Sequence, residues 1–279
     1  MVPLRLSRIT MEKVLRNPLF NRILLCFYNR KNIRISELAV LLNVSHNDLI
    51  PLVNELTELG FLNKHNDILS ATSSGAIIAY NLKALAEGPV FTFKSPLGRV
   101  LDIGCGGGRH LLEVEKCGSE ILVGADISML ALQIARVFSK KSELVLCDAH
   151  YLPFRECSFD AVIAHGLFPA VDEFRAIGEI SRVLTKNGEL FLGIQGLGLF
   201  VRFFFNSAGL KRKVGSLLSI VNTLLYLFLG KKLLELPTFQ VTTRVQRLLE
   251  KHGLQLTRLN IKKKKWVFME IALITAQKG

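Results

Sequence analysis

The sequence predicts an α/β fold in which a mostly parallel, seven-stranded sheet has helices on both faces, preceded by a small α+β module. Three observations predict it. Apolar, β-branched segments of strand length alternate with amphipathic helical segments over residues 99–195. A turn with four glycines in five residues, 104–108, joins the first of these strands to the first of these helices. Before residue 90 the apolar residues recur mainly at the spacing of an α-helix.

Composition limits the class of protein. The chain has 279 residues, of which 49% are hydrophobic and 21% charged, so it can bury a core. A net charge of +13 favours acidic partners such as nucleic acid or an anionic membrane surface. The five cysteines form no C-x-x-C pair, which predicts a reducing, cytoplasmic location without disulfides or a metal site. The N-terminal residues lack the pattern of a signal peptide.

The first module is expected to span residues 1–90. Residues 36–62 carry two apolar helical stripes, and residues 61–75 alternate around a polar turn as a hairpin does. Helix, helix and hairpin resemble the winged-helix family, in which the second helix often enters the major groove of DNA. That helix, His46–Leu59, has no Lys or Arg and three acidic residues. We therefore expect the module to pack, to form a homodimer or to cover a substrate site, with nucleic acid the less favoured partner.

A segment with two prolines and two glycines, residues 86–98, predicts a linker to a second domain over 91–279. The strands expected in that domain cover residues 99–104, 120–128, 143–149, 159–168 and 189–195. The helices expected between them cover residues 107–118, 129–141 and 171–188. Residues 254–278 predict two final strands joined by a basic turn at 262–265. Parallel strands connected by helices place a ligand crevice at the carboxyl ends of the strands.

The glycine-rich turn exposes backbone N–H groups without side chains, so a polar ligand can lie against the main chain. Dinucleotides and S-adenosylmethionine both use such a loop. The dinucleotide pattern G-x-G-x-x-G requires a small residue where this chain has Arg109. Asp102, two residues before the first glycine, would suit an ammonium group better than a pyrophosphate. These two residues favour S-adenosylmethionine.

Acidic residues also end the next two expected strands. Asp126 follows the second strand, where a carboxylate can accept hydrogen bonds from both ribose hydroxyls. Asp148 follows the third strand and is placed to accept from the adenine amino group. A single aspartate after a strand is more often a helix cap, but three at successive strand ends behind one glycine turn indicate a nucleoside site.

The segments "VLDIGCGGGRH", "VGADIS", "LCDAHYLPF" and "EISRVLTKNGELFLG" together resemble class I S-adenosylmethionine-dependent methyltransferases. The last of them has Thr-Lys-Asn-Gly where that family usually has Lys-Pro-Gly-Gly. The resemblance implies a Rossmann-like fold over residues 98–195 and S-adenosylmethionine as the cofactor. It also implies a set of cofactor-binding residues. In this set Asp102, Gly104 and Gly106 face the methionine part, Asp126 faces the ribose, and Asp148 and Ala149 face the adenine. The set is Asp102, Gly104, Cys105, Gly106, Asp126, Ile127, Asp148, Ala149 and His165.

The acceptor side of the site is expected after the fourth and fifth strands. His165 is the candidate catalytic base, because an imidazole titrates near neutral pH; its alternative role is a polar pocket residue without proton transfer. Phe168 and Gln195 are the candidate substrate-binding residues, and His150 is expected to cap a helix or face solvent. We expect methyl transfer to a hydroxyl or carbon of a small, hydrophobic or lipid-like acceptor. The alternatives are an RNA or nucleic-acid methyltransferase and a non-enzymatic regulator that senses S-adenosylmethionine.

An apolar insertion, residues 197–237, follows the fifth strand. Its central run, Val214–Gly230, is flanked by basic residues and contains Ser216, Ser219, Asn222 and Thr223. Three interpretations are open for this run. It is a buried lid over the acceptor pocket, an interfacial helix in peripheral contact with an anionic membrane, or a membrane span.

Overall fold

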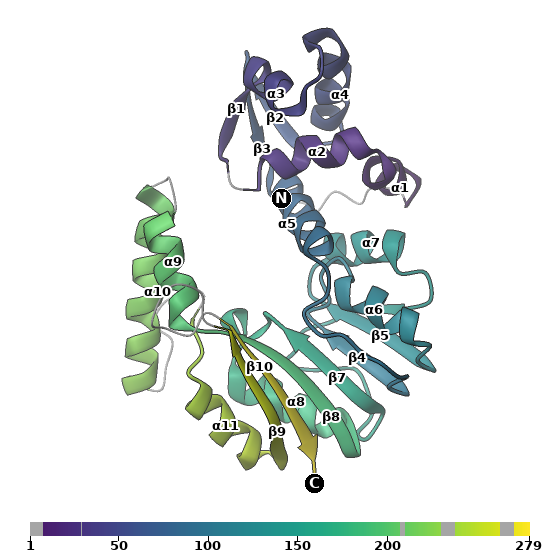
Figure 1. Ribbon diagram of the computed structural model, residues 1–279, viewed down its shortest axis with the longest axis vertical. Coiled ribbons are helices and arrows are strands. Elements are labelled where there is room, and N and C mark those ends of the chain that lie inside the picture. The colour runs from purple at the N-terminus through teal and green to yellow at the C-terminus, as the bar shows by residue number, and fades with distance from the viewer. Residues whose placement is uncertain (1–7, 29, 207–209, 230–237, 263–270) are drawn as a thin grey trace. The chain divides into compact units, whose positions relative to one another are not determined.

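The computed structural model describes residues 8–28, 30–206, 210–229, 238–262 and 271–279 (Figure 1). The chain divides into two compact units that alternate along the sequence. The first unit comprises Met1–Thr92, Cys105–Lys116 and Ser128–Leu146. The second unit comprises Phe93–Gly104, Cys117–Ile127 and Cys147–Gly279. The expected domain boundary at residue 90 stays a prediction.

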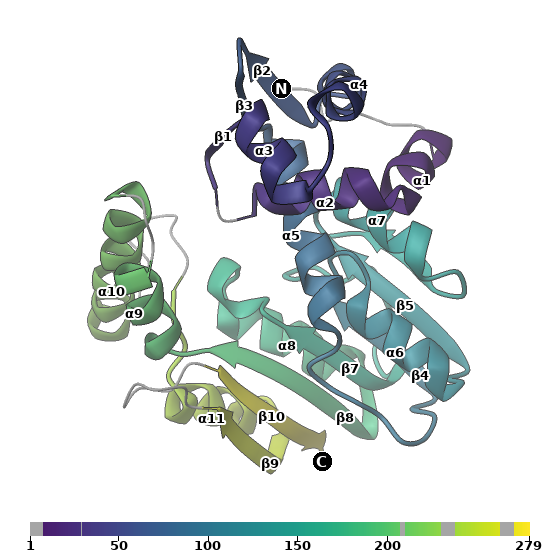
Figure 2. The ribbon, with the colours of Figure 1, turned by 45° about the horizontal axis from the view of Figure 1, so that its top comes forward.

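The first unit begins with short helices and a small antiparallel sheet. Its three strands have the order β1-β3-β2, with β3 antiparallel to both neighbours. The first elements are α1 (Arg8–Arg16), α2 (Pro18–Cys26), β1 (Asn32–Arg34), α3 (Ile35–Leu42), α4 (His46–Glu58), β2 (Leu62–His65), β3 (Ile68–Ala71) and α5 (Ser73–Glu87). Later segments of the chain add α6 (Arg109–Cys117), α7 (Met129–Phe138) and β6 (Glu143–Leu146). Figure 2 shows α2 and α5, which contact each other, from a second direction.

Local signals explain the helices of this unit. The Ser45 hydroxyl accepts a hydrogen bond from the backbone N–H of Asp48, and Thr72 accepts one from Gly75, so both helices start at an N-cap side chain. Gly75 has to be glycine, because a Cβ there would lie 2.0 Å from the carbonyl oxygen of Phe61. The helices enclose an apolar core that includes Phe20, Phe61 and other fully buried side chains.

The larger sheet has seven strands in the order β6-β5-β4-β7-β8-β10-β9. Neighbours β4 and β5, β4 and β7, and β7 and β8 pair in parallel, whereas β10 is antiparallel to both β8 and β9. The strands of the second unit are β4 (Arg99–Ile103), β5 (Ile121–Asp126), β7 (Phe159–His165), β8 (Leu184–Gln195), β9 (Leu254–Lys262) and β10 (Ile271–Lys278). The expected mostly parallel sheet of seven strands is confirmed.

The helices of the second unit follow the sheet strands in sequence. They are η1 (Phe168–Ala170), α8 (Glu173–Val183), α9 (Leu197–Asn206), α10 (Leu210–Leu229) and α11 (Thr242–Lys251). Helices α8 and α11 contact each other, and α9 lies beside α10 (Figures 1 and 2). The central strands β4, β7 and β8 supply a core of aliphatic side chains that have almost no exposed surface.

One expected boundary is wrong. Helix α8 ends at Val183 instead of Gly188, and β8 already begins at Leu184, which pairs with Phe159. The Lys278 ammonium, from the last strand, donates hydrogen bonds of 2.8 Å to the carbonyl oxygens of Ser181 and Leu184. These contacts satisfy carbonyl groups at the helix end from a distant part of the chain, so the local periodicity could not indicate them.

The insertion forms α9 and α10. Within the part of the chain that the structure describes, no helix is long and apolar enough to cross a membrane. The spanning interpretation of Val214–Gly230 is therefore wrong for its described residues. Gly230, Lys231 and Lys232 lie outside them, as do Lys263–Lys265 of the expected basic turn.

Candidate functional site

The carboxyl ends of the parallel strands in the second unit are tied together by backbone hydrogen bonds. The N–H of Gly104 donates to Ala125 at 2.8 Å, and the N–H of Cys147 donates to Asp126 at 3.1 Å. On the other side of β4, the N–H of Gly166 donates to Gly193 at 3.0 Å. The strand ends therefore form one continuous edge. Most of the predicted site residues lie on it.

The three predicted carboxylates differ in exposure. Asp102, inside β4, is 1% exposed, whereas Asp126 and Asp148 are half-buried at the ends of their segments. Ile127, next to Asp126, is 73% exposed, which is unusual for a large aliphatic side chain beside a buried strand. Of the three carboxylates, Asp126 and Asp148 are therefore the two that solvent reaches. Ala149 is half-buried beside Asp148.

His150 holds Asp148 in place, a role that the sequence did not indicate. Its Nδ1 lies 2.7 Å from Oδ1 of Asp148, and its backbone N–H donates to the same oxygen at 2.9 Å. Its Nε2 accepts a hydrogen bond of 2.8 Å from the backbone N–H of Asp172, which precedes α8. An Nε2 that accepts requires the neutral tautomer with the proton on Nδ1. His150 is thus a bridge, not a helix cap or a solvent-facing side chain.

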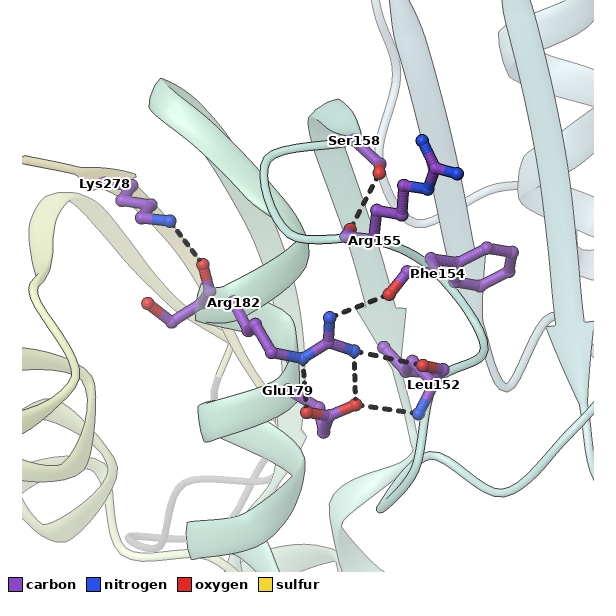
Figure 3. Close-up of polar contacts among 8 residues, drawn as sticks. Leu152, Phe154, Arg155, Ser158, Glu179, Arg182 and Lys278 are labelled. Carbon is purple, nitrogen blue, oxygen red and sulfur yellow. Dashed lines mark hydrogen bonds and ion pairs between the residues drawn. The ribbon is translucent and has the colours of Figure 1, made fainter.

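A second anchor holds the segment that follows Asp148 and Ala149 (Figure 3). Arg182 of α8 donates to the carbonyl oxygens of Leu152 and Phe154 at 3.0 and 2.7 Å. The same guanidinium binds both carboxylate oxygens of Glu179 at 2.7 Å, and Glu179 accepts from the N–H of Leu152 at 2.8 Å. The planar fork of arginine is suited to this set of acceptors.

The charges of this anchor support each other. The hydrogen bond from Arg182 lowers the pKa of Glu179, more than burial raises it. The hydrogen bond that Arg182 donates to Glu179 raises the pKa of Arg182 in turn. The pair therefore stays ionised across the physiological pH range. A Glu-x-x-Arg spacing on the predicted helix was the available sequence signal, but it did not show which loop the pair would hold.

The predicted acceptor residues lie together at the ends of β7 and β8. His165 is opposite Gly193 in the parallel register, and a Cβ at Gly193 would lie 2.1 Å from Cδ2 of the imidazole. Gln195 is close to the adjoining turn, with Nε2 3.6 Å from the Cβ position of Gly166. His165 and Gln195 are half-buried, whereas Phe168 is fully buried. A role for Phe168 in binding an acceptor stays a prediction.

We expect Gly193→Ala to displace the His165 ring, because the new methyl group would occupy its position. NMR should show altered imidazole resonances, and turnover should fall. Gly215→Ala in α10, where no atom lies within 4 Å of the new Cβ, is the matched control. Altered imidazole signals together with full turnover would argue against a role for His165.

The remaining residues of the glycine turn belong to the first unit. Gly106 and Gly108 have φ values of +55° and +86°, which side chains rarely adopt. Asn81 of α5 accepts a hydrogen bond of 2.5 Å from the N–H of Gly107, and a Cβ at Gly106 would lie 2.9 Å from the same Oδ1. Cys105 is buried. The turn is thus held by α5, from a part of the chain that the predicted site did not include.

Comparison with known proteins identifies a domain in the middle part of the chain. Residues 101–192 match the methyltransferase domain family. The match starts in β4 and ends within β8, so it includes the carboxyl ends of β4, β5, β6 and β7 but not Gly193 and Gln195. Residues 101–192 therefore form a methyltransferase domain, an enzyme domain whose cofactor is S-adenosylmethionine.

Individual relatives have different acceptors in their names. The chain is 36% identical over 104 residues to probable tRNA methyltransferase 9B of Bos taurus. The matched region covers 36% of this chain and 22% of that protein. It is 38% identical over 97 residues to demethylmenaquinone methyltransferase of Thermotoga maritima. That match covers 34% of this chain and 42% of that protein. The chain thus spans less than half the length of these relatives.

A solved structure shows the same fold. The S-adenosylmethionine-dependent methyltransferase of Mesorhizobium loti superposes with a TM-score of 0.51 at 16% identity, over 71% of this chain and 97% of that one. At this identity the likeness concerns the fold and not the acceptor.

Proposed function

We propose that the protein transfers the methyl group of S-adenosylmethionine to a hydroxyl or carbon of a small, hydrophobic or lipid-like molecule. The observation that carries the proposal is the apolar segment next to the candidate base. Helix α9 begins two residues after Gln195, and the chain returns beside the same point, because Gln240 donates to the carbonyl oxygen of Gln195 at 2.7 Å. Phe200 and Phe239 pack there with ring centroids 6.2 Å apart. A quinone methyltransferase among the relatives agrees with an apolar acceptor.

The residues of the strand-end edge have separate proposed roles. When bound, S-adenosylmethionine supplies a methyl carbon activated by a positively charged sulfur. Asp126 accepts hydrogen bonds from the ribose hydroxyls, and Asp148, held by His150, accepts from the adenine amino group. His165 removes the proton from the acceptor, and Gln195 orients it. The enzyme mainly aligns two reactants, so rigid support of these residues is part of the mechanism.

We further propose that the first unit contains a winged-helix-like domain that forms a homodimer or covers the acceptor. The element order α2-β1-α3-α4-β2-β3 with an antiparallel sheet supports this assignment. Glu55, on the second of the paired helices, binds Lys13 at 2.6 Å, and Asp48 binds Ser45 at the start of that helix. A helix that carries acidic groups and no Lys or Arg is poorly suited to a DNA backbone.

RNA is the second candidate acceptor, supported by the net charge of +13 and by the relatives named as tRNA methyltransferases. The two proposals differ in their response to salt. Binding to RNA through phosphates should fall steeply between about 50 and 200 mM salt. Turnover of an apolar acceptor should change far less.

Incubation with isotope-labelled S-adenosylmethionine identifies the acceptor. Purified protein is added to a lipid and quinone extract and, separately, to total tRNA, and labelled products are found by mass spectrometry. We expect label in an apolar product and none in tRNA nucleosides. Label in tRNA alone would replace the first proposal with the second, and label in neither, despite cofactor binding, would favour a sensor without catalysis.

A further inference from the structure

Helix α10 buries four of its polar side chains while several of its large apolar side chains are exposed. Asn222 and Thr223 have no exposed surface, and Ser216 and Ser219 are also buried. The apolar residues on the other side of the helix are 41–49% exposed. These exposed residues are Val214, Leu217, Leu218, Val221 and Leu224. Their spacing places them on one helical stripe. We call them the α10 stripe.

The buried polar face has defined partners, so this orientation is part of the fold. The Thr223 hydroxyl donates to the carbonyl oxygen of Ser219 at 2.8 Å and accepts from the N–H of Phe239 at 3.2 Å. On the same side, the ring of Tyr226 lies 4.3 Å from the guanidinium carbon of Arg244. Arg244 in turn lies 3.4 Å from the buried carboxylate of Glu173. Rotation of the helix to bury the stripe would break these contacts.

From this inverted burial we infer that the α10 stripe docks on the surface of an anionic lipid bilayer. Helix α9 adds an exposed aromatic side chain, Phe205, which is 57% exposed. Burial of apolar side chains at the headgroup boundary is the driving force of such helices. Because no described helix can cross the membrane, contact at the surface is the mode that fits α10.

The charge of the segment around α10 indicates that the α10 stripe binds a membrane and not a second copy of the chain. Between Glu189 and Glu235 the sequence has six Lys or Arg residues and no Asp or Glu. Three of the six, Lys211–Lys213, lie at the start of α10, before the stripe. Two copies of a segment with this net positive charge would repel each other, whereas anionic headgroups attract it. The inference goes beyond the proposed function and does not depend on which acceptor is methylated.

Vesicle sedimentation without cofactor or acceptor tests the inference. The full chain is mixed with phosphatidylcholine vesicles that contain or lack phosphatidylglycerol. We expect partition to require phosphatidylglycerol and to weaken at about 0.5 M salt. The double variant Leu217→Ser/Val221→Ser should lose tenfold or more in partition, because two apolar contacts are removed from an exposed surface. The variant Lys213→Gln should lose less of its partition onto vesicles, because it removes one of several positive charges.

The double variant Val40→Ser/Leu41→Ser, at exposed apolar residues of α3, is the matched control and should partition as the unchanged chain does. Equal partition of the α10 variant, or binding that does not require phosphatidylglycerol, would overturn the inference. So would a dimer in size-exclusion chromatography that Leu217→Ser/Val221→Ser converts to a monomer. Calorimetry with S-adenosylmethionine separates this test from the proposed function, because both double variants should bind the cofactor normally.

Discussion

Alanine in place of Asp126 is expected to weaken S-adenosylmethionine binding by about 1.5–3 kcal/mol, roughly tenfold to a hundredfold in Kd. The half-buried carboxylate at the end of β5 would lose its charge-assisted hydrogen bonds to the ribose. The strand itself should be unaffected, since the contact between Asp126 and Cys147 uses backbone atoms. Isothermal calorimetry measures the change directly.

Two further variants make the Asp126 test specific. Asp126→Asn keeps the shape and one acceptor oxygen, so its loss should be smaller than that of alanine. Asp67→Ala removes an exposed carboxylate from the turn between β2 and β3 and should leave the affinity unchanged. An unchanged Kd for Asp126→Ala would exclude Asp126 as the ribose ligand.

Arg182→Ala is expected to lower the free energy of unfolding by about 2–4 kcal/mol. The substitution removes the donors for two loop carbonyl oxygens and leaves Glu179 without its cation (Figure 3). It also releases the segment after Asp148, so the affinity for S-adenosylmethionine should fall as well. Urea unfolding followed by circular dichroism measures the first effect, and calorimetry measures the second.

Variants on the same helix show whether the geometry of Arg182 matters. Arg182→Lys keeps the charge but not the planar fork, so it should recover only part of the stability. Arg175→Ala, at an exposed position of α8 whose guanidinium contacts the Tyr151 hydroxyl, should cost less than about 0.5 kcal/mol. Equal stability of Arg182→Ala and Arg175→Ala would show that the anchor contributes little.

The anchor also shows the limit of sequence reasoning. The helical period predicted α8, and its apolar face is buried as expected. The partners of Glu179 and Arg182 are a loop some thirty residues earlier, at Leu152 and Phe154. At the end of the same helix, the carbonyl oxygen of Leu184 accepts a hydrogen bond from Lys278. Neither contact has a local signature, because each joins segments that only the folded sheet brings together.

Local chemistry in the sequence determined the parallel sheet, the glycine turn and the candidate cofactor residues. Strand and helix periods, the conformational freedom of glycine and the position of acids at strand ends all act over a few residues. Only the tertiary structure decided which side of α10 is buried. An amphipathic pattern defines two faces but not which one finds partners, and here Thr223 meets the chain at Phe239 while Leu217 and Val221 stay exposed. Hydrogen-bond partners from distant segments settled that choice, and they leave an apolar stripe on the surface.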